Sequence, residues 1–186
     1  MKPIYIKNFL NNPDLVFGQL MTLPWLEETA ARKEFFMSDP PGISYTYGNA
    51  VAFRTYVSQA YDVTVTHLRN QLDSTYNTNY DVCFLNRYDD EKNALGWHAD
   101  DSPEMNPQHD IAVISVGAER ELWWKPQDMK GNIPKENKQL LEHGSLFIMP
   151  AGFQQLNFHK IPKGDKPCGV RISLTFRNYV STNQDQ

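Results

Sequence analysis

From residue 80 onward, short apolar runs alternate with turn signals. β-Branched and aromatic residues dominate these runs, which is typical of β-strands. The connections between them are too short to hold crossover helices, so the strands are expected to pair antiparallel in a sandwich or jelly roll. The predicted strands are 80-YDVCFLNRY, 111-IAVISVGA, 120-RELWWK, 145-SLFIM, 155-QLNFH and 170-VRISLTFRNY.

The N-terminal part of the chain has a mixed pattern. Asn12 and Pro13 open a predicted helix, because apolar positions recur after them at roughly helical spacing. Residues 38–49 predict a loop followed by a strand, since their prolines and glycine exclude a helix. Residues 52–74 predict an amphipathic helix with its apolar positions on or near one face.

The chain of 186 residues is long enough for one domain with a sizeable core. We therefore expect a single domain over residues 1–186, mainly β with flanking helices. Its core, residues 80–180, is predicted to be a double-stranded β-helix (jelly roll). Residues 1–79 are predicted to form an N-terminal helical layer that includes a lid.

Composition and charge narrow the class of protein. The formal net charge of −4 argues against indiscriminate nucleic-acid binding, which needs many cations. Lysines nevertheless gather within residues 125–138 and 160–171, either as solvated loops or as local basic faces. Neither cysteine belongs to a CxxC pair, and no apolar run is long enough to span a bilayer. We expect a cytoplasmic monomer without membrane association, or a nuclear one if the source is a eukaryote.

The segment 96-GWHADD contains a His-x-Asp pair, His98 and Asp100, and His159 follows at the end of an apolar strand. Residues two apart in an extended segment share one face. Two imidazoles and one carboxylate form the facial triad that binds non-haem iron and keeps coordination positions open. His109 or His143 would replace His159 as the third ligand if the strands pair differently.

The last predicted strand, 171-RISLTFR, alternates strictly between two kinds of side chain. Arg171, Ser173, Thr175 and Arg177 fall on one face, and the apolar residues fall on the other. An edge strand with one solvent-exposed face would show this pattern. Two guanidinium groups on one face also suit a small dianion with two carboxylates. In 84-FLNRY, Asn86 and Tyr88 share one face and offer amide and phenol groups to the same ligand.

These motifs in this order resemble the AlkB-like 2-oxoglutarate oxygenases, and the resemblance covers roughly residues 80–180. It implies Fe(II), 2-oxoglutarate and O2 as cofactor and cosubstrates. The implied iron ligands are the triad above. Arg171, helped by Asn86 and Tyr88, would bind the distal carboxylate of 2-oxoglutarate, and Arg177 would lie near its metal-chelating end. The family usually has Asn where this chain has Ser173, so direct contact of Ser173 with the cosubstrate is an open point.

The resemblance also implies a substrate: alkylated nucleobases, in DNA first and in RNA second. Demethylation would release formaldehyde, succinate and CO2. The segment 44-SYTYG resembles the family's nucleotide-recognition lid, with Tyr47 the first candidate for stacking on a flipped base and Tyr45 the second. Some DNA-repair members have an acidic residue where this chain has Ser102, and the neighbouring Asp101 is the candidate to replace it.

Three alternatives stay open at this stage. The first is a 2-oxoglutarate oxygenase that hydroxylates another target, such as a modified base, RNA or a protein. The second is a jelly-roll binding module without turnover, against which the complete triad and both arginines argue. The third is a metal-binding cupin without 2-oxoglutarate, in which Arg171 and Arg177 would have no role.

Overall fold

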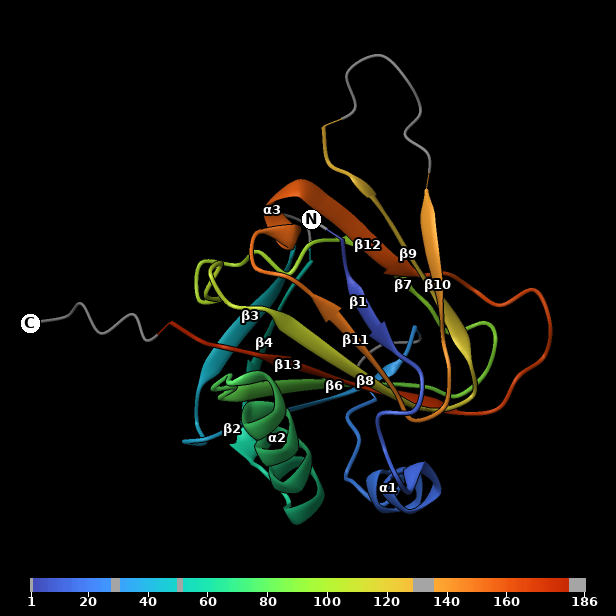
Figure 1. Cartoon of the computed structure of the whole chain (residues 1–186), viewed down its shortest axis with the longest axis horizontal. Helices are drawn as coiled ribbons and strands as arrows, with labels where there is room; N and C mark the ends of the chain where they lie inside the picture. The colour runs from blue at the N-terminus through green and yellow to red at the C-terminus, as the bar shows by residue number, and fades with distance from the viewer. Residues whose placement is uncertain (1, 28–30, 50–51, 129–135, 181–186) are drawn as a thin grey trace, which may run out of the picture.

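The computed structural model describes residues 2–27, 31–49, 52–128 and 136–180, without the side chains of residues 47–49 and 52–53. Two β-sheets pack face to face, and a separate hairpin stands beside them (Figure 1). The larger sheet, in spatial order, consists of β1 (Ile4–Ile6), β11 (Ser145–Met149), β8 (Ile111–Gly117), β13 (Arg171–Arg177), β6 (Val82–Tyr88), β2 (Lys33–Ser38) and β5 (Gln59–Ala60). The smaller sheet consists of β10 (Asn137–Leu141), β9 (Arg120–Pro126), β12 (Asn157–Ile161) and β7 (Leu95–His98). The hairpin is β3 (Ser44–Asn49) with β4 (Ala52–Val57). The predicted jelly-roll class is confirmed.

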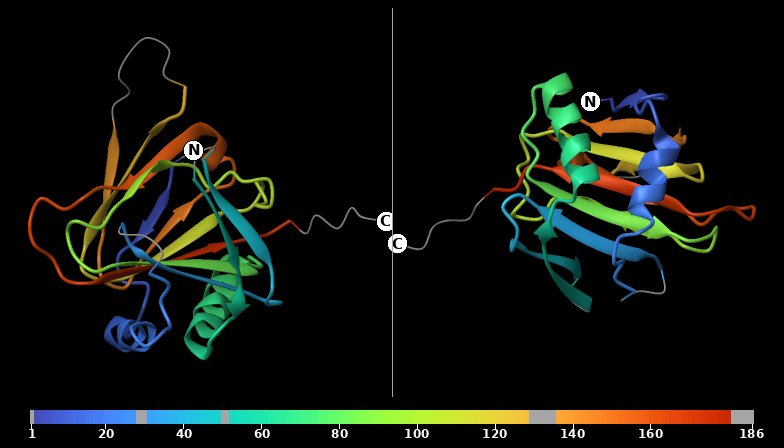
Figure 2. Two further views of the ribbon diagram at one scale, coloured as in Figure 1. Left: turned by 180° about the vertical axis from the view of Figure 1, so that it is seen from behind. Right: turned by 90° about the horizontal axis from the view of Figure 1, so that it is seen from below.

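Two helices cover the outer face of the larger sheet (Figure 2). Helix α1 (Pro13–Leu20) begins where the Asn12 side chain accepts a hydrogen bond from the backbone N–H of Leu15, as the sequence predicts for a capped start. Helix α2 (Val63–Tyr76) begins in the same way at Asp62. A third helix, α3 (Phe153–Leu156), is a single turn before β12. Among the described residues, no helix is long and apolar enough to cross a membrane.

Strand β13 lies at the centre of the larger sheet, between β8 and β6. Ile172, Leu174 and Phe176 pack into the core beneath the helices. The alternate residues face the space between the sheets, because successive side chains of a strand point to opposite faces. Every residue of β13 is buried, so the alternative interpretation of this strand as an edge strand with a solvent-exposed face is wrong.

The predicted helix over residues 52–74 is wrong in its first half. Residues 52–57 form strand β4, which pairs antiparallel with β3, and the helix begins only at Val63. Thr55, Tyr56 and Val57 are β-branched or aromatic and prefer a strand when a partner is present. The periodicity alone could not reveal that partner. The N-terminal layer is also less helical than expected, because β1, β2 and β5 all join the larger sheet.

Candidate active site

Three predicted ligands meet between the two sheets. His98 lies at the end of β7, Asp100 two residues later, and His159 opposite His98 on β12. One ligand atom from each residue lies within 4.8 Å of the others. The Asp100 carboxylate oxygens lie 3.7 Å from Nε2 of His98 and 3.8 Å from Nε2 of His159. A metal about 2.1 Å from two ligand atoms brings them within about 4.2 Å, so the group needs little adjustment to hold one.

Both imidazoles are neutral at neutral pH and so are ready to bind a metal. Burial lowers the pKa of His98, although Asp100 opposes this effect. Burial and the neighbouring His98 lower the pKa of His159 to about 3. Nδ1 of His98 lies 2.9 Å from the carbonyl of Gly96, which places its proton there and leaves Nε2 to face the metal site.

Asp100 is held by two contacts. An oxygen of its carboxylate lies 2.8 Å from Nη2 of Arg177, and its backbone N–H donates to Oε1 of Gln154 at 3.0 Å. Burial alone would raise the pKa of Asp100, but the charged Arg177 holds it below its ordinary value. The carboxylate is therefore ionised, as a metal ligand must be.

A cavity at the triad, which we call the inner chamber, is lined by residues of both sheets. Its polar lining comes largely from the alternating faces of β6 and β13. The Arg171 guanidinium is 1 % exposed and donates from Nη2 to Oγ of Ser115 at 2.9 Å. Its Nε and Nη1 atoms are buried without a hydrogen-bond partner among the described residues. Burial lowers its pKa to about 10, so the group keeps its charge at neutral pH.

The chemistry of the inner chamber fits a dianionic ligand. A buried guanidinium with unpartnered N–H groups is costly unless an acceptor completes it, and a carboxylate would do so with two parallel bonds. The Tyr88 ring packs against Arg171, with 5.2 Å between the guanidinium carbon and the ring centre. Ser173 also lines the chamber. The Asn86 amide oxygen accepts from Nε of Arg32 at 2.6 Å, which leaves the amide N–H groups as donors for a ligand.

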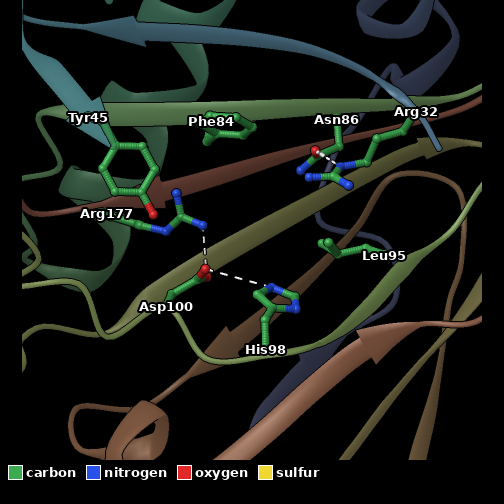
Figure 3. Close-up of a pocket in the computed structure, with 8 residues that line it drawn as sticks. All are labelled: Arg32, Tyr45, Phe84, Asn86, Leu95, His98, Asp100 and Arg177. Carbon is green, nitrogen blue, oxygen red and sulfur yellow. Dashed lines mark hydrogen bonds and ion pairs between the residues drawn. The ribbon is translucent and has the colours of Figure 1, made fainter. Parts of the chain in front are cut away.

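A second cavity, which we call the outer chamber, adjoins the inner one at His98, Asp100 and Arg177 and extends to Tyr45 (Figure 3). Tyr45, Phe84 and Leu95 supply its apolar surface. The Tyr45 side chain lies beside Arg177, which in turn reaches Asp100 (Figure 3). Burial raises the pKa of Tyr45, so its hydroxyl stays protonated. The outer chamber thus joins an aromatic pocket to the metal site.

Sequence reasoning missed a buried ionic network in the wall of the outer chamber. Arg32 pairs with Glu34, and Glu34 accepts a short hydrogen bond from the Tyr56 hydroxyl. Arg54 lies 3.5 Å from the same carboxylate. The network ties β2 to strand β4 of the hairpin. Its one sequence signal is the charged pair Arg32 and Glu34, which flanks the start of an otherwise apolar strand.

The four residues predicted to contact the substrate differ in their position relative to the outer chamber. Tyr45 is 2 % exposed and lines the outer chamber, and Ser102 lies close to its hydroxyl. Asp101 is exposed and lines neither chamber. Tyr47 belongs to β3, but its side chain lies outside the described residues.

The alternative third ligands, His109 and His143, are not part of this group. His143 accepts a hydrogen bond from the backbone N–H of Gly117 and lies 3.1 Å from Asp14 at α1. His109 lies in the loop before β8. Within the described part of the chain, the group of residues with metal-ligand spacing is the predicted triad. Both cysteines, Cys83 and Cys168, are free thiols.

A family model described as the 2OG-Fe(II) oxygenase superfamily matches residues 29–177, a span that includes the triad and both arginines. The chain belongs to this superfamily. Membership implies Fe(II), 2-oxoglutarate and O2, which agrees with the ligand set and with the unpartnered guanidinium atoms. The prediction of a 2-oxoglutarate oxygenase is therefore confirmed, and the cupin and binding-module alternatives are rejected.

Several relatives place this oxygenase among the AlkB-like members. It is 26% identical over 173 residues to the DNA oxidative demethylase ALKBH2 of Mus musculus, covering 91% of this chain and 67% of that protein. It is 28% identical over 180 residues to the alpha-ketoglutarate-dependent dioxygenase alkB homolog 3 of Bos taurus, covering 90% and 62%. The chain thus spans about two thirds of these relatives. The solved structure of OsALKBH1 shares the fold, with a TM-score of 0.64 at 15% identity over 95% of this chain and 97% of that one.

Proposed function

We propose that this oxygenase is an oxidative demethylase of alkylated nucleobases, in DNA first and in RNA second. It would release formaldehyde, succinate and CO2. One observation carries the proposal: two chambers of different chemistry meet at a single triad, one with a buried guanidinium whose Nε and Nη1 atoms lack a hydrogen-bond partner among the described residues, and one with aromatic walls. The relatives named DNA oxidative demethylase support the nucleic-acid substrate.

In this proposal His98, Asp100 and His159 hold the metal. Bound iron, with 2-oxoglutarate and O2, supplies the oxidation of a C–H bond. The protein's own part is to keep the ligands in place. The Gly96 carbonyl fixes the tautomer of His98, and Arg177 with Gln154 fixes the Asp100 carboxylate.

Cosubstrate binding is assigned to the inner chamber. Arg171 would hold the distal carboxylate of 2-oxoglutarate with its free Nε and Nη1 atoms, beside Tyr88 and Asn86. Arg177 also has unpartnered Nε and Nη1 atoms and would lie near the opposite end of the cosubstrate. Ser173 is near enough to line the same cavity, and we assign it a supporting contact.

Substrate binding is assigned to the outer chamber. A base must leave its stack to reach a buried metal, and it then needs an aromatic platform. Tyr47 is the proposed platform, carried on the hairpin strand β3 at the chamber. Tyr45 would form the wall of the pocket, because it is buried against Phe36 and Phe84. Asp101 and Ser102 directly follow Asp100 in the sequence. Ser102, close to the Tyr45 hydroxyl, is assigned a polar contact with the base, and the exposed Asp101 a contact with the substrate outside the chambers.

The test is formaldehyde release from methylated oligonucleotides by the Fe(II) protein, with mass loss of the oligonucleotide measured in parallel. Tyr47→Ala should lower kcat/KM about five- to 150-fold, because stacking of a base on an aromatic ring is worth about 1–3 kcal/mol. Tyr47→Phe keeps the ring and should retain most of the activity. If the wild-type protein forms succinate but demethylates no methylated DNA or RNA oligonucleotide, the demethylase proposal fails and another target must be sought.

A further inference from the structure

The smaller sheet carries three lysines and two tryptophans that contact one another. Lys160 of β12 lies 4.3 Å from the ring centres of both Trp97 and Trp123. Lys125 lies 4.3 Å from the Trp97 ring, and Lys138 lies 3.8 Å from the Trp123 ring. All four strands of the sheet contribute to this group. We call these five residues the Lys–Trp platform.

The platform lies on the outer face of the sheet, opposite the metal site. Trp97 directly precedes the ligand His98, and Lys160 directly follows the ligand His159. Successive residues of a strand point to opposite faces, so the ligands point inward and the platform residues point outward. Trp124 confirms the alternation, since it packs inside against Phe147 with 5.8 Å between the ring centres.

The positive charge of the platform is largely unneutralised. A contact between an ammonium group and an indole ring orients the cation without cancelling its charge. Within the described part of the chain, neither Lys125 nor Lys160 forms an ion pair with a carboxylate. Lys138 lies 3.9 Å from Glu121, which also accepts a hydrogen bond from Nε1 of Trp123 at 2.7 Å. Among the described residues, one carboxylate thus pairs with one of the three platform lysines, on a chain whose net charge is −4.

We propose that the Lys–Trp platform binds single-stranded nucleic acid next to the nucleotide that enters the outer chamber. This inference rests on the proposed demethylase function. Surfaces that bind single strands combine cations along the backbone with aromatic rings on which bases stack, and the platform has both. An acidic peptide would use the lysines but has no bases to stack on the indole rings.

Strand β7 contributes residues both to the platform and to the outer chamber. Strand β7 is an edge strand of the smaller sheet, and its residues Leu95 and His98 line the outer chamber. Trp97 lies between them in the sequence, where the pairing of β7 with β12 is irregular, and its contacts with Lys125 and Lys160 place it on the opposite face. A single-stranded nucleic acid that leaves the outer chamber over this edge of the sheet therefore reaches Trp97 first and then the lysines of β12 and β9. Such a path lets one nucleic acid occupy both sites.

The test uses a labelled, unmodified single-stranded oligonucleotide and measures its affinity by fluorescence anisotropy at several salt concentrations. The double variant Lys125→Gln with Lys160→Gln should bind more weakly, and its salt slope should be smaller by about 0.7 for each lysine lost. Trp97→Ala and Trp123→Ala should each lower the affinity about five- to 150-fold if a base stacks there. Lys7→Gln is the matched control, because it removes one charge from an exposed lysine beyond β1. Its affinity and slope should equal those of the wild type.

The double lysine variant decides the proposal, because surface glutamines leave the fold intact even if a tryptophan variant is destabilised. An unchanged affinity and slope in that variant would overturn it. The proposal would also be overturned if the wild-type protein bound polyglutamate and the lysine variants lost affinity for polyglutamate while they retained their affinity for the oligonucleotide. The probe carries no methyl group, so this result is independent of formaldehyde release. The platform and the demethylase proposal can therefore fail separately.

Discussion

The two chambers that meet at the triad are built in different ways. The inner chamber is lined by β6, β8 and β13, which are neighbours near the centre of the larger sheet and pair in continuous antiparallel register. The outer chamber shares residues of β6, β7 and β13 with the inner one and is completed by Arg32, which precedes β2, and by Tyr45 of the β3–β4 hairpin. The proposed cosubstrate chamber thus rests on a regular frame, and the added part of the proposed substrate chamber rests on segments held together by side chains such as Glu34. Substitutions should therefore stop all turnover when they affect the triad or the inner chamber, and alter substrate use alone when they affect the outer one.

The largest effect is expected at the triad, where the two chambers meet. His98→Ala and His159→Ala each remove one of the three proposed metal ligands, so turnover should fall to background with every substrate. Succinate formation with and without a methylated oligonucleotide measures this directly. Both variants should unfold near the wild-type temperature, since each removes a neutral side chain from a polar site.

Asp100 needs a milder change, because Asp100→Ala would also leave Arg177 buried without its partner. Removing one partner of a buried ion pair costs about 3–5 kcal/mol. Asp100→Asn keeps the size and one oxygen, and it should lose metal binding with a smaller loss of stability. If His159→Ala binds the metal and turns over normally, the ligand assignment is wrong.

The second largest effect is expected in the inner chamber. Arg171→Ala should weaken 2-oxoglutarate binding by about two to four decades, because a buried charge loses its partner at a cost of about 3–5 kcal/mol. Metal binding should be retained, since Arg171 is not a ligand. Titration of the Mn(II)-loaded protein with 2-oxoglutarate measures both properties.

Two further variants separate charge from geometry at this position. Arg171→Lys keeps the charge but cannot form two parallel bonds, so its affinity should fall between wild type and Arg171→Ala. Arg69→Ala removes an arginine from helix α2, where it pairs with Asp39. The affinity for 2-oxoglutarate should be unchanged in that variant. An unchanged affinity in Arg171→Ala would remove the main support for the cosubstrate assignment.

The sequence predicted the inner chamber well for a physical reason. When a strand is buried on both faces and one of them is polar, polar and apolar residues alternate strictly along it. The segment 171-RISLTFR shows this alternation. Ser115 escaped notice, although it is a polar residue in the apolar strand 111-IAVISVG. Its role depends on lying beside Arg171 across two paired strands, and that register is a tertiary property.

The outer chamber was harder to predict because its parts are distant in sequence. Arg32 and Glu34 matter through Tyr56 and Arg54, which belong to a segment expected to be helical. Gln154 supports Asp100 from a short helix that the sequence did not suggest. The platform lysines were visible only as loose groups along the chain. Pairing of β9, β12 and β10 brings them onto one face with Trp97 and Trp123.

The smallest effect that still separates the chambers is expected from Ser115→Ala. The Ser115 hydroxyl accepts the hydrogen bond from Nη2 of Arg171, and its loss leaves a third N–H group of that buried guanidinium without a partner. A hydrogen bond to a charged group contributes about 1.5–3 kcal/mol, so the affinity for 2-oxoglutarate should fall roughly ten- to 100-fold.

Ser145→Ala is the matched control for this last variant. Ser145 is the register partner of Ser115 on the neighbouring strand β11, is equally buried, and lines neither chamber. Its substitution should leave the affinity for 2-oxoglutarate unchanged. Equal losses in both variants would mean that the larger sheet, rather than the orientation of Arg171, governs cosubstrate binding. A loss confined to Ser115→Ala, with the KM for a methylated oligonucleotide unaltered at saturating 2-oxoglutarate, would show that the inner chamber can be weakened without the outer one.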